Sequence, residues 1–88
     1  SLTLLSMVKD LLIGSRYQII NIDSTVVLEA PKLASYIPLM RQNISECLSL
    51  PMTRVSVKAT TNEGLGPMGR GEGCAAFAVA SLRLVDPE

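Results

Sequence analysis

The segment "YQIINIDSTVVLEAP", residues 17–31, decides the fold that we expect. Apolar and polar side chains alternate along it, which is typical of a β-strand with one buried face. Ser24 is the only polar residue on that face. Pro31 ends the strand, because proline cannot donate to a sheet ladder and forces the preceding residue to be extended. The apolar inward positions are Ile20, Ile22, Val26 and Leu28.

The segments on either side of this strand have helical spacing. The first, before residue 14, places Leu4, Leu5, Val8, Leu11 and Leu12 on one helical face. Gly14 follows it as a C-terminal stop. A second helix is predicted between Pro31 and Pro51, and its apolar face comprises Ile37, Met40, Ile44 and Leu48.

Two further strands complete the expected order α-β-α-β-β. Val55, Val57 and Ala59 alternate with polar residues, and "CAAFAVASLRLV" from Cys74 predicts a strand with Phe77 and Val79 inward, followed by Leu82 or Leu84. The strand-helix-strand unit makes the first two strands parallel. We therefore expect an α+β layer sandwich with a mixed open sheet and helices on one face. Its apolar strands exceed what two short helices can cover, so we expect the chain to form an oligomer.

Composition limits the possible functions. The chain has 88 residues, eight basic and eight acidic side chains, and no histidine. This length fits one domain. The zero net charge argues against a nucleic-acid partner, and no apolar stretch approaches the roughly 20 residues of a membrane span. We expect Cys47 and Cys74 to be small buried side chains in a reducing compartment, rather than a disulfide or metal site.

Five of the six glycines lie in "KATTNEGLGPMGRGEG", residues 58–73. Glycine is used where a chain turns sharply or approaches another group closely. The segment does not match the P-loop pattern, and the G-x-G-x-x-G letters of residues 64–69 precede a strand pattern instead of a helix. A dinucleotide-binding turn is therefore not predicted.

The two parallel strands should end at one edge of the sheet, where open α/β sheets bind ligands. "LEAPKLAS" (28–35) follows the first strand and "ATTNEGLG" (59–66) ends the second. Lys32, Thr60 and Thr61 can donate to phosphate oxygens, and Glu63 can hold a divalent cation. A simpler alternative is that these are solvated loop side chains, and that Arg70 and Glu72 form a solvated ion pair.

Residues 21–45 and 55–82 closely resemble the carboxy-terminal part of the 2-C-methyl-D-erythritol 2,4-cyclodiphosphate synthase family. The most specific motifs are "APK" (30–32), "IPLMR" (37–41), and "KATT" (58–61) followed by Glu63 and "GRGEG" (69–73). The resemblance implies that residues 1–88 form a single domain, and that the family's amino-terminal zinc-binding part is absent from this chain.

The resemblance implies a phosphorus-oxygen lyase of non-mevalonate isoprenoid biosynthesis. This family cyclises 4-diphosphocytidyl-2-C-methyl-D-erythritol 2-phosphate to the 2,4-cyclodiphosphate and releases CMP. It uses zinc together with magnesium or manganese. It forms homotrimers with active sites between subunits and an axial cavity that can take an isoprenoid diphosphate. The corresponding location is the bacterial cytoplasm or a plastid.

The same resemblance assigns roles to individual residues. Thr61 is the catalytic residue that donates to the reacting phosphates, and Glu63 ligates magnesium or manganese. Arg70 contacts substrate and, with Glu72, lines the trimer axis. The cytidine loop comprises Leu28, Glu29, Ala30, Pro31, Lys32, Leu33 and Ala34. The phosphate and metal segment comprises Ala59, Thr60, Thr61, Asn62 and Glu63.

The chain also departs from the family pattern. The family's zinc site uses an Asp-x-His pair and another histidine, and this chain has no histidine. Tyr36 stands where histidine is common, Pro67 where an aromatic ring is frequent, and Gly64 where lysine is frequent. Two alternatives therefore stay open: a catalytically inactive trimer-forming module that retains the nucleotide-binding loops, and a generic nucleotide-binding regulatory domain.

Overall fold

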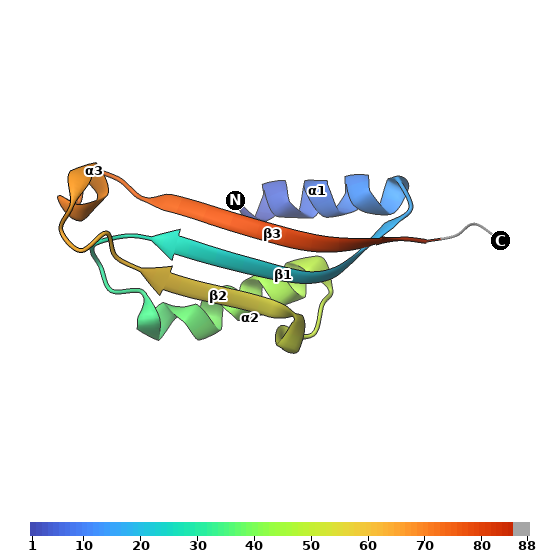
Figure 1. Cartoon of the computed structure of the whole chain (residues 1–88). Helices are drawn as coiled ribbons and strands as arrows, with labels where there is room; N and C mark the ends of the chain where they lie inside the picture. Colours follow the sequence, from blue (N-terminus) through green and yellow to red (C-terminus); the bar gives the residue numbers. More distant parts are fainter. Residues whose placement is uncertain (86–88) are drawn as a thin grey trace.

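The computed structural model describes residues 1–85 of the chain and has the expected element order (Figure 1). A one-turn helix, α3, is present in addition. Two 3-10 turns, η1 (Ala34–Tyr36) and η2 (Met52–Arg54), precede α2 and β2. The helices and strands are α1 (Leu2–Gly14), β1 (Tyr17–Val27), α2 (Ile37–Leu48), β2 (Val55–Thr60), α3 (Gly66–Gly69) and β3 (Ala75–Leu84).

The three strands form one mixed sheet in the order β2-β1-β3. β1 is parallel to β2, from Ile22 opposite Val55 to Val27 opposite Thr60. It is antiparallel to β3, and the register shifts between Ile19 and Asn21. The predicted α+β class and the parallel pairing of the first two strands are therefore confirmed.

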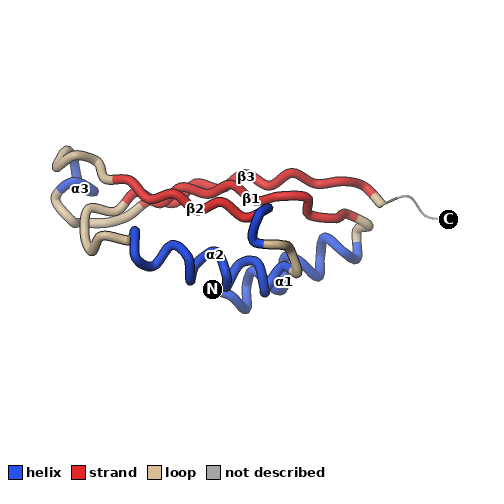
Figure 2. Tube along the Cα trace, turned by 90° about the horizontal axis from the view of Figure 1, so that it is seen from below, coloured by secondary structure: helices blue, strands red, loops and turns tan. Residues whose placement is uncertain are grey.

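Both long helices lie on one face of the sheet, as expected (Figure 2). Leu48 of α2 packs there with Val55 and Val57 of β2, and these three are the buried apolar residues of the described chain. Ser24 of β1 is opposite Val57 in the register and so shares this face. Its hydroxyl donates to the Ser56 carbonyl at 3.0 Å, which satisfies the one polar position that the sequence placed inward.

The expectation that Phe77 and Val79 point inward is wrong. The register places Phe77 opposite Thr25, on the face away from the helices, and Ala78 opposite Ser24, on the covered face. Phe77 is 65% exposed and Val79 is 69% exposed. Leu82 and Leu84, the other predicted inward residues, share the face of Ala78 but remain exposed, and residues 76–84 of β3 are exposed on both faces. The expectation fails because it took the larger side chains of the strand to be the buried ones.

The apolar face of α1 is also only partly covered. Leu5 and Leu12 are half-buried, whereas Leu4 and Leu11 remain exposed. Lys9 is half-buried between the two leucines along the helix, and its Nζ donates to Ser49 Oγ at 2.9 Å. The packed stripe of α1 is thus narrower than the sequence indicated.

The two cysteines have different environments. Both are free thiols. Cys47 is half-buried on α2, whereas Cys74 is exposed just before β3. The expected burial of Cys74 is therefore wrong, because this residue belongs to the end of the exposed glycine-rich loop and not to the packed part of the strand.

The uncovered face of the sheet carries an ion pair between Lys58 and Asp23, whose strands are adjacent. Both side chains are more than half exposed. The hydrogen bond from Lys58 and its positive charge hold the pKa of Asp23 below the ordinary value of 3.8. Charged and apolar side chains therefore share this face, since Phe77 and Val79 lie on it too.

The chain buries little of its surface. Its radius of gyration is 15.2 Å, whereas a compact domain of this length has about 12 Å. It exposes 6274 Å², whereas a compact monomer of this mass exposes about 5000 Å². The excess exposure includes large apolar residues of α1 and β3. Among residues 1–85, no helix is long and apolar enough to cross a membrane.

Candidate functional site

The candidate site lies where β1 and β2 end side by side (Figure 1). Val27 and Thr60 are the last paired residues, and Leu28 N–H then donates to the Thr60 carbonyl at 3.0 Å. Beyond this bond the chain enters the first loop, residues 28–34, and the second loop, residues 61–73. The sequence predicted this edge of the sheet correctly, because parallel strands end together.

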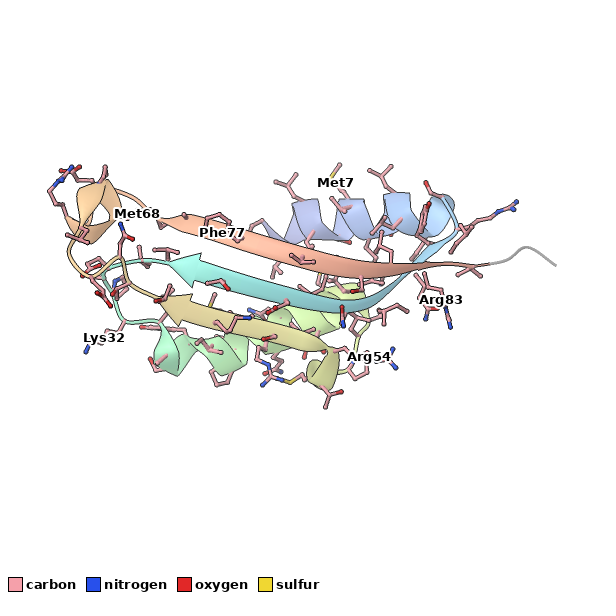
Figure 3. All side chains as sticks on the ribbon, in the orientation of Figure 1. Met7, Lys32, Arg54, Met68, Phe77 and Arg83 are labelled. Carbon is pink, nitrogen blue, oxygen red and sulfur yellow. The ribbon has the colours of Figure 1, made fainter. Side chains whose placement is uncertain are left out.

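A hollow of about 210 Å³ lies between the first loop, the start of α2 and residues 59–61, where β2 passes into the second loop. It contains eight of the residues that the sequence assigned to the site, together with Ile37, which had been assigned only to the apolar face of a helix. Ile37 begins α2 and is half-buried. The lining residues are Leu28, Glu29, Lys32, Leu33, Ala34, Ile37, Ala59, Thr60 and Thr61. Figure 3 shows Lys32 at this end of the sheet, with Met68 of α3 at the same end.

Five assigned residues do not line this hollow: Ala30, Pro31, Asn62, Glu63 and Arg70. Asn62 still contributes to the site, because its backbone N–H donates to Glu29 Oε2 at 3.3 Å. Glu63 is exposed beside Thr61, whose Oγ1 accepts a hydrogen bond from the Glu63 N–H at 3.2 Å. The hydroxyl of Thr61 thus helps to hold the backbone of Glu63, two residues further along the loop.

The second loop has its own internal structure. Asn62 Nδ2 donates to the Leu65 carbonyl at 2.6 Å, and Leu65 N–H donates back to the Asn62 carbonyl at 3.0 Å. Glu63 has a φ of 54°, in the left-handed region that residues other than glycine rarely adopt. Such conformations persist only where the surrounding structure holds them, and they are enriched at functional sites.

Gly69 marks the closest approach within the second loop. A Cβ at Gly69 would lie 2.2 Å from the carbonyl carbon of Gly64, so the loop folds back onto its own backbone there. The one-turn helix α3 makes this reversal, and Pro67 occupies its first turn, where the missing N–H costs nothing. The sequence predicted no helix in this segment. α3 lies within the G-x-G-x-x-G letters of residues 64–69 and is followed by β3.

Arg70 and Glu72 form an exposed ion pair at the end of the second loop. Arg70 Nε donates to Glu72 Oε1 at 3.0 Å, and Arg70 Nη2 donates to Glu72 Oε2 at 3.2 Å. Both side chains are more than half exposed, so the pair contributes less than about 1 kcal/mol to stability. The ion pair that the sequence offered as the simpler alternative is therefore present.

The donor set of the chain does not fit zinc. The chain has no histidine. In residues 1–85, no three cysteine, aspartate or glutamate side chains lie close enough together to hold a metal ion. Zinc sites take about three or four such ligands. Magnesium fits better, because it binds through one or two carboxylates with water and substrate phosphates. Glu63 is the exposed carboxylate available for it in the second loop.

A second hollow, of about 540 Å³, was not predicted from the sequence. It lies at the other end of the sheet, between the end of α1, the start of β1 and the end of α2. Leu12, Ile19 and Leu48 form part of its apolar wall, and Lys9 and Arg16 also line it. Leu12 and Leu48 have the spacing of ordinary core positions in the sequence. Ile19 was not among the predicted inward residues, and the register of β1 with β3 shifts beside it, between Ile19 and Asn21.

Comparisons of the sequence with known proteins identify a family and close relatives. The profile of the YgbB family matches residues 1–83. A protein of Chlorobium phaeobacteroides is 55% identical over 84 residues, which are 96% of this chain and 53% of that protein. One from Gloeobacter violaceus is 52% identical over 93% of this chain and 50% of that protein. Both are named 2-C-methyl-D-erythritol 2,4-cyclodiphosphate synthase. The chain spans about half the length of these relatives.

Solved structures share the fold. The synthase of that name from Plasmodium vivax superposes with a TM-score of 0.93 at 34% identity, over 97% of this chain and 57% of the other. A CDP complex of IspF from Plasmodium falciparum gives a TM-score of 0.91 at 28% identity, over 97% and 55%. The resemblance inferred from the sequence motifs is thereby confirmed.

Replacement of Gly69 by alanine should open the second loop. The added Cβ cannot fit against the Gly64 backbone, so α3 and the residues before it must move apart. Gly73→Ala is the matched control, because a Cβ there meets nothing within 4 Å. Amide chemical shifts should change throughout residues 61–72 in Gly69→Ala and only locally in Gly73→Ala. Similar spectra for both variants would contradict the close approach.

Proposed function

Because the chain belongs to the YgbB family, we propose that it forms the nucleotide- and phosphate-binding portion of a 2-C-methyl-D-erythritol 2,4-cyclodiphosphate synthase. The hollow of about 210 Å³ carries this proposal, since Lys32, Thr60 and Thr61 line it together. In the reaction, the 2-phosphate of the cytidine-diphosphate-linked methylerythritol attacks the β-phosphorus, the cyclic diphosphate closes, and CMP leaves.

This reaction depends on positioning the substrate and on neutralising its phosphate charge, because the attacking 2-phosphate and the β-phosphorus belong to the same molecule. The first loop would hold the cytidine, and its Lys32 would place a positive charge near the diphosphate. Thr61 would donate from its hydroxyl to the reacting phosphates as their charge redistributes. The CDP complex of the Plasmodium falciparum protein supports a cytidine nucleotide as the ligand class.

Glu63 would hold magnesium or manganese against the phosphates, where the ion would neutralise part of their charge. The zinc that the family resemblance implies finds no histidine in this chain, and residues 1–85 hold no cluster of three side chains that could ligate it. No step is therefore assigned to zinc. Arg70, which the resemblance places near substrate and the trimer axis, would act from outside the hollow of a single chain.

A homotrimer would cover surface that one chain leaves exposed. The uncovered sheet face carries Phe77 and Val79. Burial of such apolar area contributes about 25 cal/mol per Å². In this assembly Arg70 and Glu72 would lie near the threefold axis, where Arg70 is the cation available to an isoprenoid diphosphate. Arg70 already donates from Nε and Nη2 to Glu72. This ion pair would weaken the interaction of Arg70 with an isoprenoid diphosphate.

A non-catalytic trimer-forming module is the second candidate function. The observation that favours it is the lack of histidine, because this chain by itself cannot supply a family-type zinc site. Such a module would keep the nucleotide-binding loops and the assembly surface. Both candidate functions predict a trimer. They differ in whether CMP is released when the amino-terminal half of a relative is added.

Sedimentation equilibrium should give a particle of about three times the 9.4 kDa mass of one chain. Replacement of Phe77 by serine should shift the particle toward the monomer, because this residue lies on the uncovered face. Leu39→Ser, at an exposed position on the outer side of α2, is the control. A folded, stable wild-type monomer at micromolar concentration would count decisively against the trimer.

Replacement of Lys32 by alanine should weaken CDP binding by about 1.5–3 kcal/mol, the usual effect of losing a charge-assisted hydrogen bond. Arg54→Ala is the control, because Figure 3 shows Arg54 at the opposite end of β2. Lys9→Ala would be a poorer control, because the Lys9 side chain is half-buried and its Nζ donates to Ser49 Oγ. Calorimetry that finds equal losses for Lys32→Ala and Arg54→Ala would exclude a specific role for the first loop.

The 88-residue chain should release no CMP from the cytidine-linked substrate when zinc and magnesium are added. Magnesium at Glu63 alone would leave the attacking phosphate poorly oriented, and this chain lacks the ligands for zinc. Addition of the amino-terminal half of a relative, which by resemblance supplies the histidines, should restore release. Release by the chain alone would show that zinc is not needed, and no release from the mixture would favour the non-catalytic module.

A further inference from the structure

One side chain joins the two loops of the candidate site. Glu29 of the first loop accepts a hydrogen bond at Oε2 from the backbone N–H of Asn62 in the second loop, at 3.3 Å. In the described part of the chain, no other hydrogen bond connects residues 28–34 with residues 61–73. The backbone ladder between β1 and β2 stops just before this point, at the bond from Leu28 to Thr60.

Asn62 lies between two residues that the proposed function uses. It lies between Thr61, which lines the hollow, and Glu63, the candidate ligand for magnesium. The other hydrogen bonds of residues 62–72 stay within the second loop or bind Thr61. Among the described residues, the bond to Glu29 is therefore the hydrogen bond that links residues 62–72 to the first loop.

We propose that Glu29 is a positioning residue, which sets the separation between the nucleoside side of the site and its phosphate side. The proposal rests on the proposed function, because it assigns those two sides to the first and second loops. A carboxylate suits this role because it is a stronger acceptor for an N–H than a neutral group, and Glu29 and Asn62 are both half-buried. Glu29 also lines the hollow, so a shift of its side chain would change the space available to a ligand.

A ligand that contacts both loops should depend on Glu29, whereas a ligand confined to one loop should not. CDP carries a second phosphate that would reach Thr61 and Glu63, whereas CMP lacks it. This difference separates a positioning role from a general loss of folding, because a damaged fold would weaken the binding of both nucleotides.

Two variants and one control test the proposal. Glu29→Ala removes the acceptor, and Glu29→Gln keeps an oxygen that can accept the Asn62 N–H while removing the charge. Glu46→Ala is the control, because Glu46 also accepts a hydrogen bond through its carboxylate, from Gln42, but lies on α2 away from the hollow. All are compared with the wild-type chain in the same assembly state.

The first measurement is hydrogen exchange at the Asn62 amide without any ligand. We expect Glu29→Ala to exchange about tenfold faster there, on the order expected for one lost hydrogen bond. Glu29→Gln should retain most of the protection, and Glu46→Ala should not change it. Unchanged exchange at Asn62 in Glu29→Ala would overturn the bridge between the loops.

The second measurement is the affinity for CDP and for CMP with magnesium present. Glu29→Ala should weaken CDP binding about tenfold or more and CMP binding less than about threefold. Glu29→Gln should recover most of the CDP affinity. Equal losses for both nucleotides, or an unchanged CDP affinity, would overturn the positioning role while leaving the proposed function intact. No CDP binding by the wild-type chain would instead contradict the proposed function, and the exchange at Asn62 would still decide whether Glu29 joins the loops.

Discussion

The central position of β1 is the constraint on which the rest of the structure depends. β2 lies on one side of β1 and runs parallel to it, and β3 lies on the other side and runs antiparallel. The second loop, which connects β2 to β3, must therefore pass across the end of β1, over about two strand spacings of roughly 4.8 Å. The first loop leaves β1 at that same end. The contact between the two loops is thus a direct result of the strand order.

This crossing also explains the concentration of glycine in residues 58–73. The second loop reverses direction and re-enters the sheet while staying against the end of β1. Gly64 and Gly66 adopt positive φ values of 76° and 69°, and Gly69 contacts the Gly64 backbone with no room for a Cβ. A bulkier loop would have to bulge away from the strand ends, and Thr61 would no longer share a hollow with Lys32.

Local pattern predicted the elements well, because alternation and helical spacing are properties of the chain itself. Local pattern failed to predict which face of a strand is covered, because that depends on pairing between residues far apart in the sequence. The sequence cannot show which face of β3 meets the helices, since the register with β1 decides whether Phe77 or Ala78 is opposite Ser24. Within the site, position at the strand ends was enough to assign Lys32 and Thr61. The bond from Asn62 to Glu29 depends on how two loops meet, and no motif encodes it.

The uncovered face of the sheet and the candidate site use alternate residues of the same strand, β2. Ala59 lines the hollow, whereas its neighbour Lys58 points to the uncovered face and bonds Asp23. Only Val55 and Val57 of this strand are buried, so the end that carries Ala59 and Thr60 has little packing of its own. A partner that covered Lys58 and Phe77 would therefore also immobilise the strand ends from which both loops start. Assembly and ligand binding would then be coupled through one short strand, because alternate side chains of that strand face the two surfaces.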